Sequence, residues 1–137
     1  MNKLSKTKDV VQHPESEEIE YKSNWDDNCL KVVSAFANTN GGNLIVGVDD
    51  NKNVIGILDI KKLLVDLPNK IKDKTGIIPA IETEKRNGKE IIKIKISPSS
   101  VPISYDGRYY IRSGSTTQQL QGQHLTDFLI KKSGRTW

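Results

Sequence analysis

The 137-residue sequence predicts an α+β fold in which about three helices pack on a mixed, mainly antiparallel sheet. Apolar residues recur at helical spacing in three segments, 26–40, 58–75 and 123–132. Between them, short segments have strand-like composition, and two of these flank Asn87-Gly88, the dipeptide most typical of a tight hairpin. Because helical and strand patterns are interleaved along the chain, we expect them to form one domain with a shared core.

The first half of the domain is predicted to be a strand, a helix and a second strand. Residues 18–22 alternate apolar and charged side chains, as a half-buried strand does. A helix follows, capped by Asp26 or Asp27, and its buried face consists of Leu30, Val33, Phe36 and Ala37. The apolar run 43–48 is expected to be a buried strand, with a turn at 50–53 and a short returning strand at 54–56.

The second half is predicted to be a helix, a hairpin, one more strand and a last helix. The helix at 58–75 contains Pro68, which is expected to kink or restart it, and ends at Gly76. Strands at 80–85 and 90–96 form the hairpin, and a final strand covers 108–113. Residues 113–123 are expected to be a polar loop, followed by a helix at 123–132 that turns Leu125, Phe128 and Leu129 inward.

Length and composition indicate one soluble domain. With 35% hydrophobic residues, the chain can build a single core, which we assign to residues 15–132. Residues 1–14 are expected to be a flexible or crossing arm, and 133–137 the start of a linker to further C-terminal domains. No apolar run approaches the roughly 20 residues that a membrane span needs, and no secretory signal is evident, so the expected compartment is the cytoplasm. Cys29, His13 and His124 lack the spacing of a zinc site.

Charge is distributed unevenly along the chain. The net charge is +4, and residues 108–137 carry five basic side chains against one acid. Residues 15–27 instead carry six acids and one lysine. A basic end of this kind is compatible with nucleic-acid binding but is weak evidence for it alone.

Three segments together resemble the Schlafen-type Alba-like (AlbA_2) family. They are ESEEIEYK at 15–22, SAFANTNGGNLIVGVDD at 34–50 and YYIRSGS at 109–115, and the middle one is the most specific. The resemblance spans roughly residues 15–129. It implies a Schlafen/Alba-like fold and a DNA-binding domain of a transcriptional regulator, with DNA or RNA as partner. Related vertebrate enzymes clamp RNA with two such modules, so a homodimer would be needed to mimic them.

The expected nucleic-acid contacts lie in the last strand and the loop after it. Arg112 with Ser113, Ser115 and Thr116 combines a fixed cation with hydroxyls around a glycine, the ingredients for holding phosphate. An ordinary polar surface loop is equally compatible with these residues, and the resemblance favours the contact. Arg108 and Lys22 are expected to extend this surface, ahead of Lys131, Lys132 and Arg135.

Asn38, Gly41 and Gly42 are interpreted as a structural turn. The two glycines allow the chain to leave the helix with a positive φ and enter the next strand at once. The Asn38 amide can bind exposed carbonyls at the helix end, which we favour over a ligand contact.

An enzyme is the first alternative. The resemblance to RNA-cleaving Schlafen proteins implies Glu15, Glu20 and Asp49 as catalytic residues holding Mg²⁺ or Mn²⁺, whereas the binding interpretation needs no cofactor. Five residues apart on one straight strand, Glu15 and Glu20 would face opposite sides, so a bend between them is required. One carboxylate of this segment could instead pair with Lys22 or Arg112. A second alternative is a protein-interaction or nucleotide-sensing module.

Overall fold

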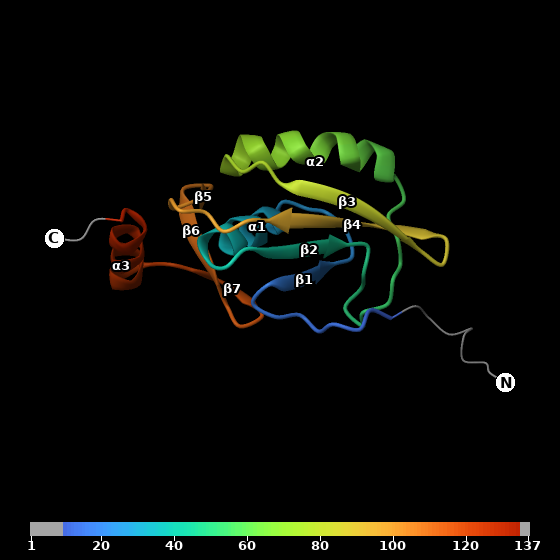
Figure 1. Cartoon of the computed structure of the whole chain (residues 1–137), viewed down its shortest axis with the longest axis horizontal. Coiled ribbons are helices and arrows are strands. Elements are labelled where there is room, and N and C mark those ends of the chain that lie inside the picture. The colour runs from blue at the N-terminus through green and yellow to red at the C-terminus, as the bar shows by residue number, and fades with distance from the viewer. Residues whose placement is uncertain (1–9, 135–137) are drawn as a thin grey trace.

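Four strands form the main sheet of the protein. The computed structural model describes residues 10–134 and shows an α+β fold, as the sequence predicts (Figure 1). In spatial order the strands are β1 (Ile19–Lys22), β2 (Gly42–Val46), β4 (Lys89–Ile96) and β3 (Ala80–Arg86). β1 pairs parallel to β2, and the other two pairings are antiparallel.

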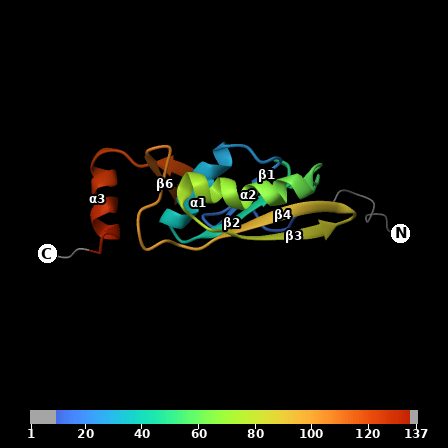
Figure 2. The same ribbon diagram turned by 90° about the horizontal axis from the view of Figure 1, so that it is seen from above.

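A second, smaller sheet and three helices complete the fold. The sheet consists of antiparallel β5 (Ser104–Tyr105), β6 (Arg108–Ser113) and β7 (Thr116–Gln119). Helix α1 (Asn28–Asn38) lies behind the main sheet and contacts β6, so it stands between the two sheets. Helix α2 (Ile60–Thr75) runs along the main sheet, and α3 (Gly122–Lys132) stands at one end of the molecule (Figure 2).

The main core lies between α1, α2 and the main sheet. The predicted buried face of α1 is confirmed, and α1 is buried on nearly every side because both sheets cover it. Ile92, Ile94 and Ile96 of β4 point into this core, as their alternation predicts. A smaller apolar cluster covers part of the other face of the sheet and consists of Val11, Tyr21, Val48, Val54 and Ile91.

The predicted turns are confirmed. Gly76 ends α2 with a φ of +79°, and Asn87 and Gly88 turn β3 into β4 with φ values of +51° and +79°. Gly41 has a φ of +77°, and its N–H donates to the carbonyl of Phe36 at 2.7 Å. A Cβ at Gly41 would lie only 2.6 Å from the carbonyl oxygen of Ile96.

Gly41 and Gly88 form a matched pair for testing this close approach. Both have φ values near +78°, but a Cβ at Gly88 would meet nothing within 4 Å. Gly88→Ala is expected to lower the free energy of unfolding by about 1 kcal/mol, the strain of a left-handed alanine. Gly41→Ala is expected to cost about 2 kcal/mol, because crowding adds to that strain. Urea unfolding of both variants measures the difference, and equal losses would contradict a packing role for Gly41.

Two predicted details are wrong, and a third is confirmed only in part. The returning strand at 54–56 is only a single bridge between Val48 and Val54, because a strand so short cannot continue the ladder. The predicted polar loop contains β7, whose four residues are all polar and therefore lack the apolar alternation that indicates a strand. The predicted inward side of α3 is confirmed, because Leu125, Phe128 and Leu129 are half-buried whereas Ile130 is exposed, but none of them is fully buried because α3 stands at one end of the molecule.

The described part of the predicted N-terminal arm crosses the body. Val11 is buried in the smaller cluster, and its N–H donates to the carbonyl of Lys52 at 2.9 Å. Residues 1–9 of that arm and residues 135–137 of the predicted linker lie outside the described residues. Among residues 10–134, no helix is both long and apolar enough to span a membrane.

Candidate nucleic-acid interface

The side chain of Arg112 crosses from the small sheet to the segment before β1. It is 3% exposed, and its guanidinium lies 5.0 Å from the centre of the Phe36 ring. Its Nη2 donates to the carbonyl of Ser16 at 2.7 Å and its Nε to the carbonyl of Glu17 at 3.2 Å. Its Nη1 donates to Glu20 Oε1 and to Thr117 Oγ1, both at 3.0 Å. Arg112 therefore fastens the small sheet to the edge of the main sheet.

This placement differs from the exposed, phosphate-facing role predicted for Arg112. Successive residues of a strand face opposite sides, and β6 turns Tyr110 and Arg112 inward. Arg112 stands between Ile111 and Ser113, so the sequence alone would favour turning Ile111 inward and Arg112 outward. The alternative that Arg112 forms an ion pair with a carboxylate of the acidic segment is confirmed.

Glu20 is held in an unusual electrostatic environment. Burial raises the pKa of its carboxyl, and nearby Glu15 raises it further. The Arg112 guanidinium opposes both effects by its charge and by its hydrogen bond. Lys22 Nζ lies 3.9 Å from the other carboxylate oxygen of Glu20. The negative charge of Glu20 is thus offset by cations on two sides.

A groove of about 460 Å³ runs between β1, α1 and the β6–β7 hairpin. Lys22 and Lys31 line it, together with the polar side chains of Asn28, Ser115, Thr117 and Gln119. Its base includes Tyr110, whose ring centre lies 5.9 Å from Lys31 Nζ. Counting Lys22, Lys31 and Arg112 against Glu20, the lining has a net charge of +2. We call this the β1–α1 groove.

Sequence reasoning found part of this groove and missed the rest. It identified Lys22, Arg112 and Ser115, which the fold brings together, but not Lys31, Asn28 or Gln119. One signal for Lys31 was available, because it is the only charged residue within α1. A cation retained on a helix that is otherwise almost entirely buried has to face the uncovered side of that helix.

The remaining predicted contacts lie outside the groove lining. Arg108 is exposed at the far end of β6, where its Nη1 lies 3.3 Å from Asp106 Oδ2. Ser113 and Thr116 pair across the turn between β6 and β7, and the Thr116 hydroxyl donates to the carbonyl of Ser113 at 2.7 Å. Both residues are exposed next to Ser115.

Glu15, Glu20 and Asp49 are only partly brought together. The chain bends before β1, where Ser16 and Ile19 form a bridge, so the required bend is present and Glu15 lies near Glu20. Glu15 Oε2 accepts the Tyr21 N–H at 3.1 Å, and it lines a separate hollow with Asp49. Asp49 Oδ1 accepts the N–H groups of Asn51 and Asn53, at 2.9 and 2.8 Å.

These carboxylates do not fit a metal centre as they stand. Within residues 10–134, no three histidine, cysteine, aspartate or glutamate side chains are arranged to hold a metal ion. Glu20 turns into the β1–α1 groove, whereas Asp49 stabilises its own turn. The geometry therefore favours a structural and electrostatic role for these residues.

The predicted structural turn has the bonding expected of it. Asn38 is buried at the end of α1 and binds backbone groups of Tyr110 in β6 and of Ile103 just before β5. Gly42 packs against the ring of Phe36, where a Cβ would lie 2.7 Å from ring carbons. These residues thus set the junction between α1, β2 and the small sheet.

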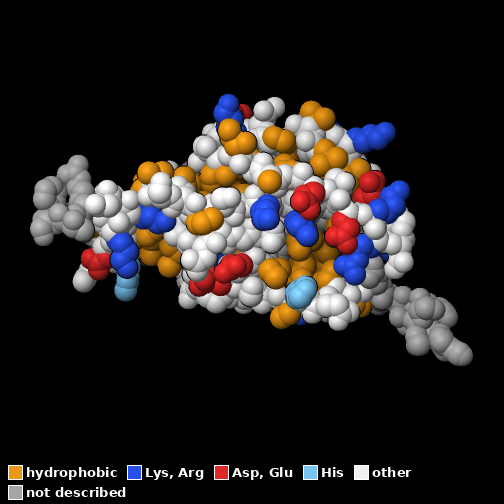
Figure 3. Space-filling view, viewed as in Figure 1, with side chains coloured by type: hydrophobic (Ala, Val, Ile, Leu, Met, Phe, Trp, Pro, Cys, Tyr) orange, Lys and Arg blue, Asp and Glu red, His pale blue; other side chains and the backbone are white. Residues whose placement is uncertain are grey.

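Positive charge is not concentrated on the open face of the main sheet. Figure 3 shows that lysine and arginine side chains there lie among aspartate and glutamate side chains. Glu82, for example, sits opposite Lys93 in the sheet register. That mixed surface offers a polyanion no continuous attraction, unlike the β1–α1 groove.

Several solved structures share this fold, including the following two. A protein from Corynebacterium diphtheriae superposes with a TM-score of 0.63 at 21% identity, covering 76% of this chain and 25% of that chain. The present chain thus spans about a quarter of that protein. The N-terminal domain of a RecG-related protein from Nitrosomonas europaea gives a TM-score of 0.57 at 27% identity, covering 80% of this chain and 87% of that one.

The family comparison agrees with the motifs at 15–22, 34–50 and 109–115. The family model described as Schlafen, AlbA_2 matches residues 15–121, which include β1 to β7 and both helices of the core. The match ends before α3, short of the limit near residue 129 expected from the motifs. Since it covers most of the chain, including every residue that lines the β1–α1 groove, the chain belongs to the Schlafen AlbA_2 family.

Proposed function

We propose that this domain binds nucleic acid in the β1–α1 groove, mainly through phosphate contacts, as the DNA-binding module of a transcriptional regulator. The observation that carries the proposal is that two lysines from different elements, Lys22 of β1 and Lys31 of α1, line the same groove. Membership of the Schlafen AlbA_2 family supports it, as does the likeness to a domain of a protein named for its relation to RecG, a DNA helicase.

The chemistry of the groove suits a phosphate backbone better than a base edge. Two ammonium groups supply charge, while Ser115, Thr117 and Gln119 supply donors for phosphate oxygens. Arg112 neutralises Glu20, so the carboxylate within the groove does not cancel the attraction of the lysines. Tyr110 is 7% exposed and cannot offer its ring for base stacking, so phosphate contacts dominate, and these carry little sequence information.

Lys22→Gln and Lys31→Gln are expected to weaken duplex binding severalfold each. Each should also reduce the slope of log K against log salt by about 0.9, because one phosphate contact is lost. Lys70→Gln is the matched control, since Lys70 is an exposed lysine of α2 outside the groove. Fluorescence anisotropy with labelled duplex DNA, single-stranded DNA and RNA over a salt series measures both quantities.

Two results would overturn the proposal. If all three lysine variants lose the same affinity, the attraction comes from overall charge and not from the groove. If the protein cleaves RNA with Mn²⁺ but not with EDTA, and Glu20→Gln abolishes cleavage while binding persists, the domain is a metal-dependent nuclease.

A further inference from the structure

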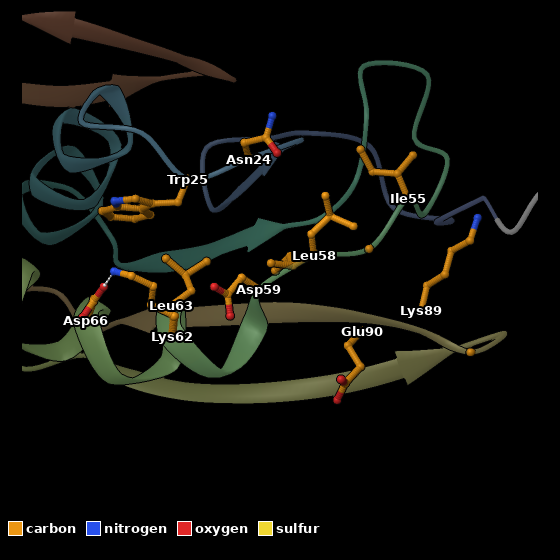
Figure 4. A pocket seen from close by; sticks show the side chains of 13 residues that line it. Asn24, Trp25, Ile55, Leu58, Asp59, Lys62, Leu63, Asp66, Lys89 and Glu90 are labelled. Atoms are coloured by element: carbon orange, nitrogen blue, oxygen red, sulfur yellow. Dashed lines mark hydrogen bonds and ion pairs between the residues drawn. The ribbon is translucent and has the colours of Figure 1, made fainter.

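A pocket of about 690 Å³ lies beside the start of α2, separate from the β1–α1 groove. It is bounded by Asn24 and Trp25, by residues 55–59, by the first turns of α2 and by the end of the β3–β4 hairpin (Figure 4). Its volume falls within the range of natural ligand sites. We call it the Trp25 pocket.

The floor and the lip of the Trp25 pocket are apolar. Trp25, Ile57 and Leu63 line it and also pack against the main core, so this floor is fixed in place. At the lip, Leu58 is fully exposed and Ile55 is 44% exposed. In Figure 4, Trp25 and Leu63 lie at one end, Ile55 at the other, and Leu58 between them. Large aliphatic side chains gathered around a pocket are typical of an interaction site, whereas isolated ones are not.

The charged groups of the pocket favour a cation. Three carboxylates line it, those of Asp59, Asp66 and Glu90, against two ammonium groups, those of Lys62 and Lys89. The lining thus has a net charge of −1 on a chain whose net charge is +4. Nucleic acid is disfavoured here, and a basic partner is favoured.

The lysine at the pocket entrance is already paired. Lys62 Nζ lies 2.8 Å from Asp66 Oδ2, and the hydrogen bond and charge of Asp66, with a smaller effect of Asp59, raise the pKa of Lys62. Asp59 makes no capping hydrogen bond at the start of α2. Its exposed carboxylate is therefore available to a ligand.

We propose that the Trp25 pocket binds a short segment of a partner protein in which an aliphatic side chain is flanked by lysine or arginine. The aliphatic group enters between Leu58 and the floor formed by Trp25 and Leu63. The flanking cation meets the carboxylates of Asp59 and Glu90 at the rim. Burial of the aliphatic group provides most of the affinity, and the carboxylates provide the preference for a basic segment.

The connection from β1 to α1 contributes to both the Trp25 pocket and the β1–α1 groove, but with different side chains. The segment from β1 to α1 contributes Lys22 and Asn28 to the groove but Asn24 and Trp25 to the pocket. Because the lining residues do not overlap, a partner protein and nucleic acid can be bound at the same time. The pocket therefore provides a route by which a regulator would recruit a protein while holding nucleic acid.

Titration of the ¹⁵N-labelled protein with capped tripeptides tests the proposal by NMR. The probes are Lys-Leu-Arg, Ser-Leu-Ser and Glu-Leu-Glu, with Lys-Ala-Arg to remove the aliphatic anchor. Lys-Leu-Arg is expected to shift the resonances of Trp25 and Leu63 and to bind about fourfold more tightly than Ser-Leu-Ser, with Glu-Leu-Glu weakest. Lys-Ala-Arg is expected to bind more weakly than Lys-Leu-Arg.

Three variants separate the two parts of the site. Leu58→Ser is expected to weaken every leucine peptide, and Asp59→Asn to reduce only the preference for the basic one. Val65→Ser is the control, because Val65 is an exposed aliphatic residue of α2 that does not line the pocket. The proposal fails if Glu-Leu-Glu binds as well as Lys-Leu-Arg, if Leu58→Ser changes nothing, or if no pocket resonance shifts at about 10 mM peptide.

Discussion

Replacing Arg112 with alanine is expected to lower the free energy of unfolding by about 4 kcal/mol at pH 7, because it removes the buried cation from a mostly buried carboxylate and leaves only the more exposed Lys22 near it. Glu20 then keeps its charge in a site where burial and Glu15 already oppose ionisation. The carbonyls of Ser16 and Glu17 also lose their donors. Urea unfolding followed by circular dichroism measures the loss.

The pH dependence of this loss identifies its cause. The pKa of Glu20 is raised above its ordinary value of 4.5 in the folded protein. A raised pKa contributes stability that is fully present below the unfolded pKa and is lost as pH rises through the folded pKa. Without Arg112 the folded pKa of Glu20 rises further, so the difference between Arg112→Ala and the wild type should be smaller at pH 4.5 than at pH 7. An equal difference at both pH values would mean that packing, and not charge, accounts for the loss.

Arg108→Ala is the matched control. The Arg108 side chain is 52% exposed and pairs at 3.3 Å with Asp106, which is exposed too. Exposed pairs contribute little, so the expected loss is below about 0.5 kcal/mol. Arg112→Lys retains the positive charge but not the planar guanidinium, so its loss of unfolding free energy should fall between those of Arg112→Ala and Arg108→Ala. A cost for Arg112→Ala no larger than that for Arg108→Ala would show that Arg112 does not hold the two sheets together.

Most of the fold could be predicted because its signals are local. The β3–β4 hairpin follows from Asn87-Gly88 and the alternation of β4, and α2 ends where Gly76 predicts. The segment from 113 to 123 is predicted to be a loop but contains β7, because β7 is a polar strand of only four residues that is held by pairing to β6. Its strand character arises from a neighbour and not from its own apolar pattern.

The candidate site was harder to predict because it depends on which part of a strand face is covered by other elements. Arg112 and Arg108 lie on one strand and are both basic, yet one is buried and the other exposed. The difference arises from α1 and from Ser16 and Glu17, which lie more than ninety residues away along the chain. Only the tertiary structure shows that Arg112 is buried and paired with Glu20, so that Lys22 and Lys31 are the accessible cations of the groove lining.

The groove lysines lie on different elements, so their spacing depends on how α1 is fixed to its neighbours. Lys22 ends β1, Lys31 lies on α1, and the opposite wall belongs to the β6–β7 hairpin. Arg112 joins that hairpin to β1, and Asn38 joins it to the end of α1. We therefore expect changes at these two buried residues to reduce nucleic-acid affinity through the geometry of the groove.

Asn38→Asp is expected to lower the free energy of unfolding by about 4 kcal/mol at pH 7, and Asn38→Ala by about 3 kcal/mol. Asn38 Nδ2 donates to the carbonyls of Ile103 and Tyr110, both at 2.8 Å, and Oδ1 accepts the Ile103 N–H at 2.8 Å. Alanine leaves these backbone groups without their partner. Aspartate can still accept from Ile103, but it places a carboxylate oxygen against two carbonyl oxygens, which costs more than an empty position.

Acid distinguishes the two Asn38 variants, because a protonated aspartate regains one donor. The carboxyl that Asn38→Asp introduces would have a raised pKa, so its extra cost should be present at pH 7 and should disappear near pH 4, whereas the cost of alanine stays constant. Asn69 is exposed on α2, and its change to aspartate or alanine should cost less than about 0.5 kcal/mol. If aspartate and alanine at position 38 cost the same at both pH values, the two donor bonds do not hold α1 to the small sheet. The spacing of Lys22 and Lys31 would then have to be fixed by Arg112 alone.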